Sequence, residues 1–118
     1  MIMNLDTFIK KIIANESVTF SETMAIIDEH FQYQASQFHN GLGKDRLTNT
    51  AGTNEGSCKI FAFARLQQLD KLQTLALFGD YYRLDVLSNP EGNDHQNIRN
   101  FIKYGWDGIT FDQEPLSR

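Results

Sequence analysis

The stretch CKIFAFARLQQL, residues 58–69, is apolar on nearly every side when it is wound as a helix. A helix without a solvated face has to be surrounded by other elements, so this segment predicts a central, largely buried helix. The chain has 118 residues, which is enough for one hydrophobic core and too few for two. We therefore predict a single domain over residues 1–118, built around this helix.

Two segments near the amino terminus have the periodicity of amphipathic helices. In the first, Asn4 is placed to cap the helix and Asn15 to end it. Its apolar stripe consists of Leu5, Phe8, Ile9, Ile12 and Ile13. In the second, Thr19 and Glu22 have the spacing of a capping box. Its stripe consists of Phe20, Met24, Ile27 and Phe31.

Residues 70–90 predict a further helix. Asp70 and Gln73 repeat the capping-box spacing at its start, and Pro90 ends it. Gly79 lies inside this pattern and weakens it, so it marks a point of close packing or a bend. The apolar stripe consists of Leu72, Leu75, Phe78, Tyr82 and Val86.

The last predicted helix begins after Asn93 or Asp94, either of which has the side chain of an N-cap residue. Gly105 is placed at its C-terminal end, where a left-handed residue is common. The inward-facing residues are Ile98, Phe101 and Ile102.

The longest segment without helical periodicity is NGLGKDRLTNTAGTNEGS, residues 40–57, and we predict an irregular Asn/Gly loop there. Residues 31–35 and 108–111 have strand character and allow one short two-stranded ribbon. The predicted fold class is therefore mainly α: a single compact domain of about five helices with a long irregular loop.

Charge and cysteine content limit the classes of partner. The net charge is −4 and basic residues occur singly or in pairs, which argues against a nucleic-acid-binding surface. No apolar run approaches the roughly twenty residues that span a bilayer, so we expect no membrane partner. The single cysteine permits no internal disulfide and suits a reducing compartment. We expect a cytoplasmic protein whose partner is an unidentified protein or small molecule.

Several strings in the chain resemble the HopJ type III effector family when they are taken in order: FHNG, NEGSCKIFAFA, TLALFGDYYRLDVL, DHQNIRNF and GWDGITF. The resemblance runs from about Phe20 to Leu116. It implies a small domain associated by name with proteins injected into plant cells, and it implies no reaction, ligand or active site.

Type III substrates usually begin with a flexible, polar leader, whereas here an amphipathic helix is predicted from Leu5. We therefore expect a resident cytoplasmic protein, with secretion into host cells as the alternative.

The segment LTNTAGTNEGSCKIF, residues 47–61, invites three interpretations. A phosphate-binding P-loop is excluded, because Gly52 and Gly56 have three residues between them and Lys59 follows only after Ser57 and Cys58. A cysteine in the first turn of a helix would have a lowered pKa and form a reactive thiolate. The alternative is a small apolar residue that fills the core.

A cysteine-dependent enzyme would also need a base. Among the three histidines, His95 is the best candidate for pairing with Cys58, with Asp94 or Asn97 to orient the ring. The alternative is that His95 occupies the first turn of its helix with no catalytic role. We regard a non-enzymatic protein as the better prediction, because free cysteine is usually buried.

A small-ligand or anion site is the remaining hypothesis. Unpaired amides near Ser57, together with Lys59, would hold one anion at a helix start. Arg83 or Arg99 would clamp a carboxylate or phosphate, unless each pairs with a neighbouring aspartate. The candidate ligand-binding residues are Asn54, Ser57, Lys59, Arg83, His95 and Arg99.

The histidines at positions 30, 39 and 95 lack paired spacing, and one cysteine cannot form a CxxC half-site. The sequence therefore predicts no metal site and no cofactor. The leading functional prediction is a non-enzymatic interaction or effector-like module, followed by the ligand-binding protein and then the cysteine enzyme.

Overall fold

The computed structural model describes residues 4–118. Its helices are α1 (Leu5–Ile13), α2 (Phe20–His30), α3 (Glu55–Leu66), α4 (Lys71–Ala76) and α5 (Gln96–Tyr104), with a π-helical segment η2 (Tyr81–Val86) and two 3-10 turns, η1 (Gly43–Asp45) and η3 (Gly105–Gly108). Its strands are β1 (Gln32–Tyr33), β2 (Phe38–Asn40), β3 (Leu47–Asn49), β4 (Thr110–Phe111) and β5 (Leu116–Ser117). The domain is mainly helical, as predicted, but it also contains two small antiparallel sheets.

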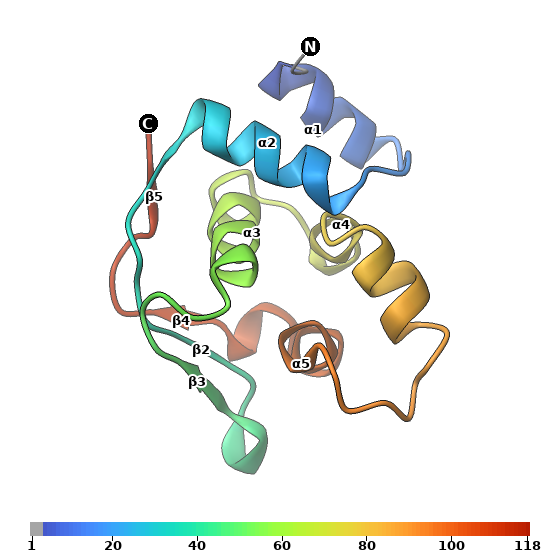
Figure 1. Ribbon diagram of the computed structural model, residues 1–118, viewed down its shortest axis with the longest axis vertical. Coiled ribbons are helices and arrows are strands. Elements are labelled where there is room, and N and C mark those ends of the chain that lie inside the picture. The colour runs from blue at the N-terminus through green and yellow to red at the C-terminus, as the bar shows by residue number, and fades with distance from the viewer. Residues whose placement is uncertain (1–3) are drawn as a thin grey trace.

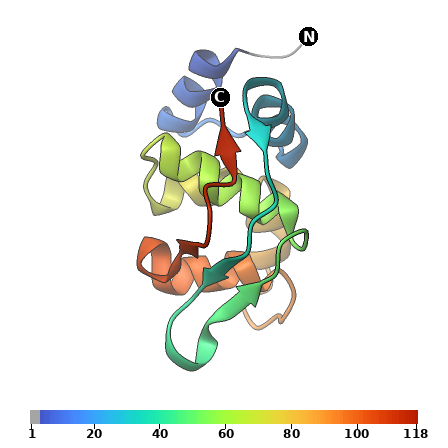
Figure 2. The same ribbon diagram turned by 90° about the vertical axis from the view of Figure 1, so that its left-hand side faces the viewer.

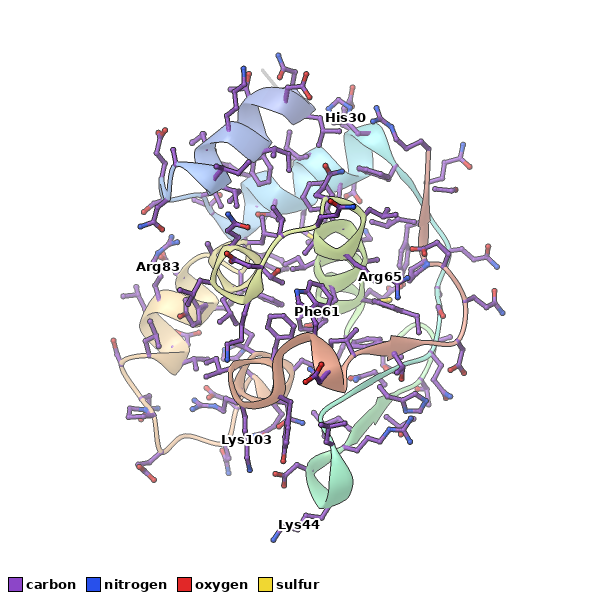
Figure 3. The ribbon with its side chains drawn as sticks, turned by 180° about the vertical axis from the view of Figure 1, so that it is seen from behind. His30, Lys44, Phe61, Arg65, Arg83 and Lys103 are labelled. Carbon is purple, nitrogen blue, oxygen red and sulfur yellow. The ribbon has the colours of Figure 1, made fainter. Side chains whose placement is uncertain are left out.

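The predicted central helix is α3, which α1 and α2 cover on one side, α4 and α5 on others, and the strands on the remaining one (Figure 1). Five consecutive residues, from Ile60 to Ala64, are 0% exposed. Phe61 lies in the middle of the molecule, whereas Lys44, Arg83 and Lys103 lie at its periphery (Figure 3). The prediction of a central, largely buried helix is confirmed, although α3 begins at Glu55, three residues before the predicted start, and Leu66 near its end is 43% exposed.

The predicted helix caps at three starts are confirmed. The Asn4 side chain accepts from the Thr7 amide, and Thr19 with Glu22 and Asp70 with Gln73 form complete capping boxes. One residue of the first stripe was placed wrongly: Ile13 is 62% exposed. Phe8 and Ile12 define the buried line of α1, and the next residue lies about 100° further round the helix, toward solvent.

The single helix predicted over residues 70–90 is wrong, because the chain breaks at Gly79. α4 ends at Ala76, Gly79 has φ +62°, and η2 begins at Tyr81. A Cβ atom at Gly79 would lie 2.7 Å from the backbone nitrogen of Phe20. The break therefore lets the start of α2 pack directly against this backbone, so both effects predicted for Gly79, bending and close packing, occur together.

The prediction of one irregular loop over residues 40–57 is also wrong. This segment contains η1 and β3, and β3 pairs with β2 to form a hairpin. The two stretches with predicted strand character do form strands, but they do not pair with each other: β1 pairs with β5, and β4 pairs with β2. Phe38 of β2 is 0% exposed and lies opposite Asn49 and Phe111, so burial of this residue fixes the register.

Candidate functional site

A cleft of about 490 Å³ lies where α3 and α5 begin, and β3 forms a further wall. The starts of both helices lie on the same side of the molecule, beside β3 (Figure 2). Amide and hydroxyl side chains line the cleft together with aromatic rings, and none of its described lining residues is Lys, Arg, Asp or Glu. The cleft is therefore polar, and its lining includes the imidazole ring of His95.

The two helices that begin at the cleft start differently from the others. Asn54 precedes α3 with φ 50° and His95 precedes α5 with φ 49°, and neither side chain caps its helix. The prediction that Asn93 or Asp94 caps the last helix is wrong, since His95 occupies that position. By contrast, α1, α2 and α4 each have a capping side chain, and none of these capping residues lines the cleft. The first-turn backbone N–H groups of α3 and α5 donate to no acceptor within residues 4–118.

A set of hydrogen-bonded asparagine side chains forms the floor between the two helix starts. Asn40 Nδ2 donates to the backbone oxygen of Asn97 at 2.8 Å and to its Oδ1 at 3.0 Å. Asn49 and Asn97 exchange two hydrogen bonds of 3.1 and 2.9 Å, and Asn54 Nδ2 donates to Asn49 Oδ1 at 2.7 Å. We call these four residues, Asn40, Asn49, Asn54 and Asn97, the asparagine network.

The orientation of each amide in the network follows from one backbone group. The Asn40 atom that contacts the Asn97 carbonyl has to be nitrogen, so the Asn97 atom that accepts from it is oxygen. The same reasoning then fixes Asn49, and through it Asn54. Asn40 Oδ1 stays buried with no partner among the described residues, as this fixed orientation requires.

Aromatic side chains close the other side of the cleft. The Phe20 ring lies 5.0 Å from that of Tyr81, and the Tyr81 ring lies 5.2 Å from that of His95, measured between centroids. A Cβ atom at Gly56 would lie 2.8 Å from Phe20 Cζ, so glycine at this position lets the ring pack on the start of α3. His95 Nε2 lies 3.0 Å from Asp85 Oδ2, and this contact holds the ring at the rim.

Cys58 is 1% exposed and does not line the cleft. Its Sγ donates to the backbone oxygen of Ser36 at 3.8 Å. Burial raises the pKa of the Cys58 thiol, which contradicts the interpretation as a reactive thiolate and agrees with the alternative of a residue that fills the core. No hydrogen bond joins Cys58 to His95 in the described part of the chain. The structure does not bring the predicted nucleophile and base together.

The predicted cationic ligands lie outside the cleft and pair with acidic residues. Lys59 Nζ lies 2.9 Å from Asp28 Oδ1, and an Arg83 nitrogen lies 3.3 Å from Asp80 Oδ1. The first ion pair joins α3 to α2, and the second lies within one segment, between residues three positions apart. Pairing with a nearby aspartate is the alternative that the sequence also offered for Arg83. Arg83 also donates to the backbone oxygen of Val18 at 3.0 Å.

Arg99 has the same structural role in the segment that leads to His95. It donates to Asp94 Oδ1 at 2.7 Å and to the backbone oxygens of Asp94 and Asn89 at 2.6 and 3.0 Å. The Asp94 carboxylate is thereby paired with Arg99 and not with the His95 ring. The hydrogen bond from Arg99 lowers the pKa of the Asp94 carboxyl. Of the predicted site residues, Asn54, Ser57 and His95 line the cleft, and Asp94, Arg99, Arg83, Lys59 and Cys58 do not.

Sequence reasoning missed Asn49 as a member of the site, and it considered Asn97 only as a residue that orients the His95 ring. Asn49 and Asn97 are 4% and 8% exposed, so both are buried polar side chains. The signal for Asn97 was present: it lies four residues before Phe101 and hence on the apolar face of α5, where a polar residue needs an explanation. Asn49 had no such signal, because the strand that contains it was not predicted.

Within residues 4–118, no group of three or more histidine, cysteine or acidic side chains is arranged to hold a metal ion. No helix in this part of the chain is both long and apolar enough to cross a bilayer.

Comparisons with known proteins agree with the sequence-based resemblance. The family model for HopJ type III effector protein matches residues 5–116. A crystal structure described as unknown function protein VPA0580 is 47% identical, with a TM-score of 0.92, over 99% of this chain and 95% of that one. No match was found among curated proteins. The fold is therefore shared with a solved structure whose description names no activity.

Proposed function

This chain belongs to the HopJ type III effector protein family, and from that premise we propose that it is a non-enzymatic module that binds a small organic ligand in the cleft between α3, α5 and β3. The observation that carries the proposal is the convergence of three predicted ligand residues, Asn54, Ser57 and His95, on that cleft. We therefore retain these three residues as ligand-binding candidates and no longer include the three cationic ones, Lys59, Arg83 and Arg99.

Size and lining support a ligand of small-molecule dimensions. About 490 Å³ lies within the range of roughly 300–1,000 Å³ that is usual for such sites. Phe20, Phe78 and Tyr81 supply apolar area, while the network and the helix starts supply a few fixed polar groups. This combination is typical of pockets that orient a bound molecule.

The same geometry favours binding over catalysis. The only thiol of the chain is buried away from the cleft with a raised pKa, and the His95 ring is held by Asp85. A cysteine nucleophile would need a base within hydrogen-bond reach and a lowered pKa. We therefore give the ligand-binding function precedence over the cysteine-dependent enzyme.

The test is a nuclear magnetic resonance screen of the full chain with a chemically diverse panel of small compounds. We expect at least one compound to shift backbone amides of Gly56, Ser57, Asn97 and Ile98 together. Ser57→Leu, which places an apolar side chain in the cleft, should abolish these shifts. Thr7→Leu, at the matching third position of α1, should not. A panel that shifts no cleft amide would contradict the proposal.

The family description favours a second candidate function, that of an exported effector that binds a host protein. Under this proposal the chain leaves the cytoplasm through a type III apparatus, and under the alternative it stays there. A fusion to a reporter enzyme that is active only inside host cells separates the two. Signal that depends on a working secretion apparatus supports export, and its absence supports the cytoplasmic role.

A further inference from the structure

We propose that the ligand of this cleft carries a single carboxylate on an apolar or aromatic body, with the carboxylate held between the starts of α3 and α5. The inference rests on the proposed function, because it names the chemical class of the ligand for that same site. It follows from the balance of hydrogen-bond donors and acceptors in the cleft, from the two helix starts, and from the residues that surround them.

Two members of the asparagine network, Asn49 and Asn97, have used their side-chain acceptors and kept donors. Asn97 Oδ1 accepts from Asn40 and Asn49, and Asn49 Oδ1 accepts from Asn97 and Asn54, so both lone pairs of each oxygen are engaged. Each of the Asn49, Asn54 and Asn97 amides donates a single hydrogen bond within the described residues and retains one N–H. All three side chains line the cleft, and Asn49 and Asn97 are more than nine-tenths buried.

Unsatisfied donors on buried side chains select a ligand with acceptor oxygens. A buried N–H without an acceptor is costly, and a ligand that supplies one removes that cost. An ammonium or other donor group placed against the buried Asn49 and Asn97 amides would meet N–H groups, because the oxygens of these two side chains already accept two hydrogen bonds each. The network therefore discriminates by the polarity of the ligand and not only by its shape.

The helix starts add donors and positive potential in the same place. The first-turn N–H groups of Gly56 and Ser57 in α3, and of Asn97 and Ile98 in α5, have no acceptor in the described part of the chain. All four residues line the cleft. Each helix start carries about half a positive charge, and an anion placed between the two interacts favourably with both.

The surroundings limit the charge of the ligand and define its body. None of the described lining residues is lysine or arginine, and the Asp85 carboxylate lies against His95 at the rim, so the charge of a doubly charged phosphate would be poorly neutralised. A carboxylate needs less compensation. The rings of Phe20, Phe78 and Tyr81 offer apolar surface for the remainder of the molecule.

The experiment compares four probes by isothermal titration calorimetry on the full chain: phenylacetate, phenylacetamide, phenethylamine and inorganic phosphate. We expect phenylacetate to bind tightest, by about tenfold over phenylacetamide, because hydrogen bonds to a charged acceptor are the stronger ones. Asn54→Gly keeps the left-handed backbone and removes one donor, so it should weaken phenylacetate by about tenfold. Asn15→Gly, another left-handed asparagine (φ 61°) outside the cleft, is the matched control and should bind as wild type.

Ser57→Asp provides an independent arm. Its carboxylate would lie at the third position of α3, so it should abolish phenylacetate binding while leaving the thermal midpoint at or above that of wild type. Thr7→Asp, at the third position of α1, should leave binding unchanged. Retained binding in Ser57→Asp would overturn the inference.

The outcomes separate the inference from the function on which it rests. Tighter binding of phenethylamine, phenylacetamide or phosphate than of phenylacetate, with the loss in Ser57→Leu, would overturn the carboxylate inference and leave the ligand-binding function standing. Failure of all four probes to bind would count against the inference and, together with a silent screen of diverse compounds, against the function as well.

Discussion

Replacement of Gly79 by alanine should lower the free energy of unfolding more than the same change at a freely exposed glycine. Gly79 has φ +62°, a conformation that costs an L-residue about 1–2 kcal/mol. The added Cβ would also lie 2.7 Å from Phe20 N and 3.2 Å from the Thr19 Cα and carbonyl carbon, all of them backbone atoms. Overpacking of this kind typically costs about 1–3 kcal/mol. The expected total loss is therefore about 2–5 kcal/mol.

Gly43 is the matched control, because its φ of +59° is nearly the same and a Cβ there would meet nothing within 4 Å. Gly43→Ala should lose only the backbone part, about 1–2 kcal/mol. Urea unfolding of both variants, fitted with a common slope, measures the difference directly. Equal losses at the two positions would refute the claim that the start of α2 packs against the backbone of Gly79.

Three further predictions concern the thiol, a surface carboxylate and the asparagine network. Cys58 should resist alkylation by iodoacetamide in the native protein and react on unfolding, because it is buried with a raised pKa; rapid native modification across neutral pH would contradict this. Hydrogen bonds from Lys103 and Tyr104 lower the pKa of Asp45, so its contribution to stability is present above the unfolded pKa and is lost as pH falls through the folded one. Asp45→Asn should therefore flatten the acid limb of the stability curve, and parallel curves for the two proteins would disprove the link. Asn97→Ala should cost about 3 kcal/mol in urea unfolding because it leaves buried partners unsatisfied, whereas exposed Gln96→Ala should stay within about 0.5 kcal/mol.

Local signals in the sequence were sufficient for the parts of the fold that local interactions determine. The capping residues Asn4, Thr19 and Asp70 interact with amides three residues away, so the sequence contains both partners of each contact. The buried segment around Phe61 was equally clear, because a helix that is apolar on all sides has a single consistent location in a small domain.

The errors lie where distant segments determine the outcome. The break at Gly79 depends on contact with Phe20, and β2 has its place because Phe38 is buried opposite Asn49 and Phe111. Strands of two or three residues are too short to show a reliable alternation. No local pattern could therefore have revealed the hairpin formed by β2 and β3.

The candidate site contains some residues that local sequence identifies and others that depend on contacts between distant segments. Asn54, Ser57 and His95 were found from sequence because Asn, Ser and His near helix starts are recognisable polar groups. The partner of Lys59 could not be found in the same way, because Asp28 lies 31 residues earlier in the chain. The network around Asn97 depends on contacts 48 to 57 residues apart in the chain, which only the fold brings together.

A crystal structure of the full chain with phenylacetate tests the central claim most directly. The account predicts that the carboxylate lies between α3 and α5, with its oxygens within about 3.2 Å of the backbone nitrogen of Ser57 or Asn97 and of a network amide. The ring should lie against Phe20 and Tyr81. A ligand bound with its ring toward the helix starts and its carboxylate in solvent, or bound away from this cleft, would contradict the account.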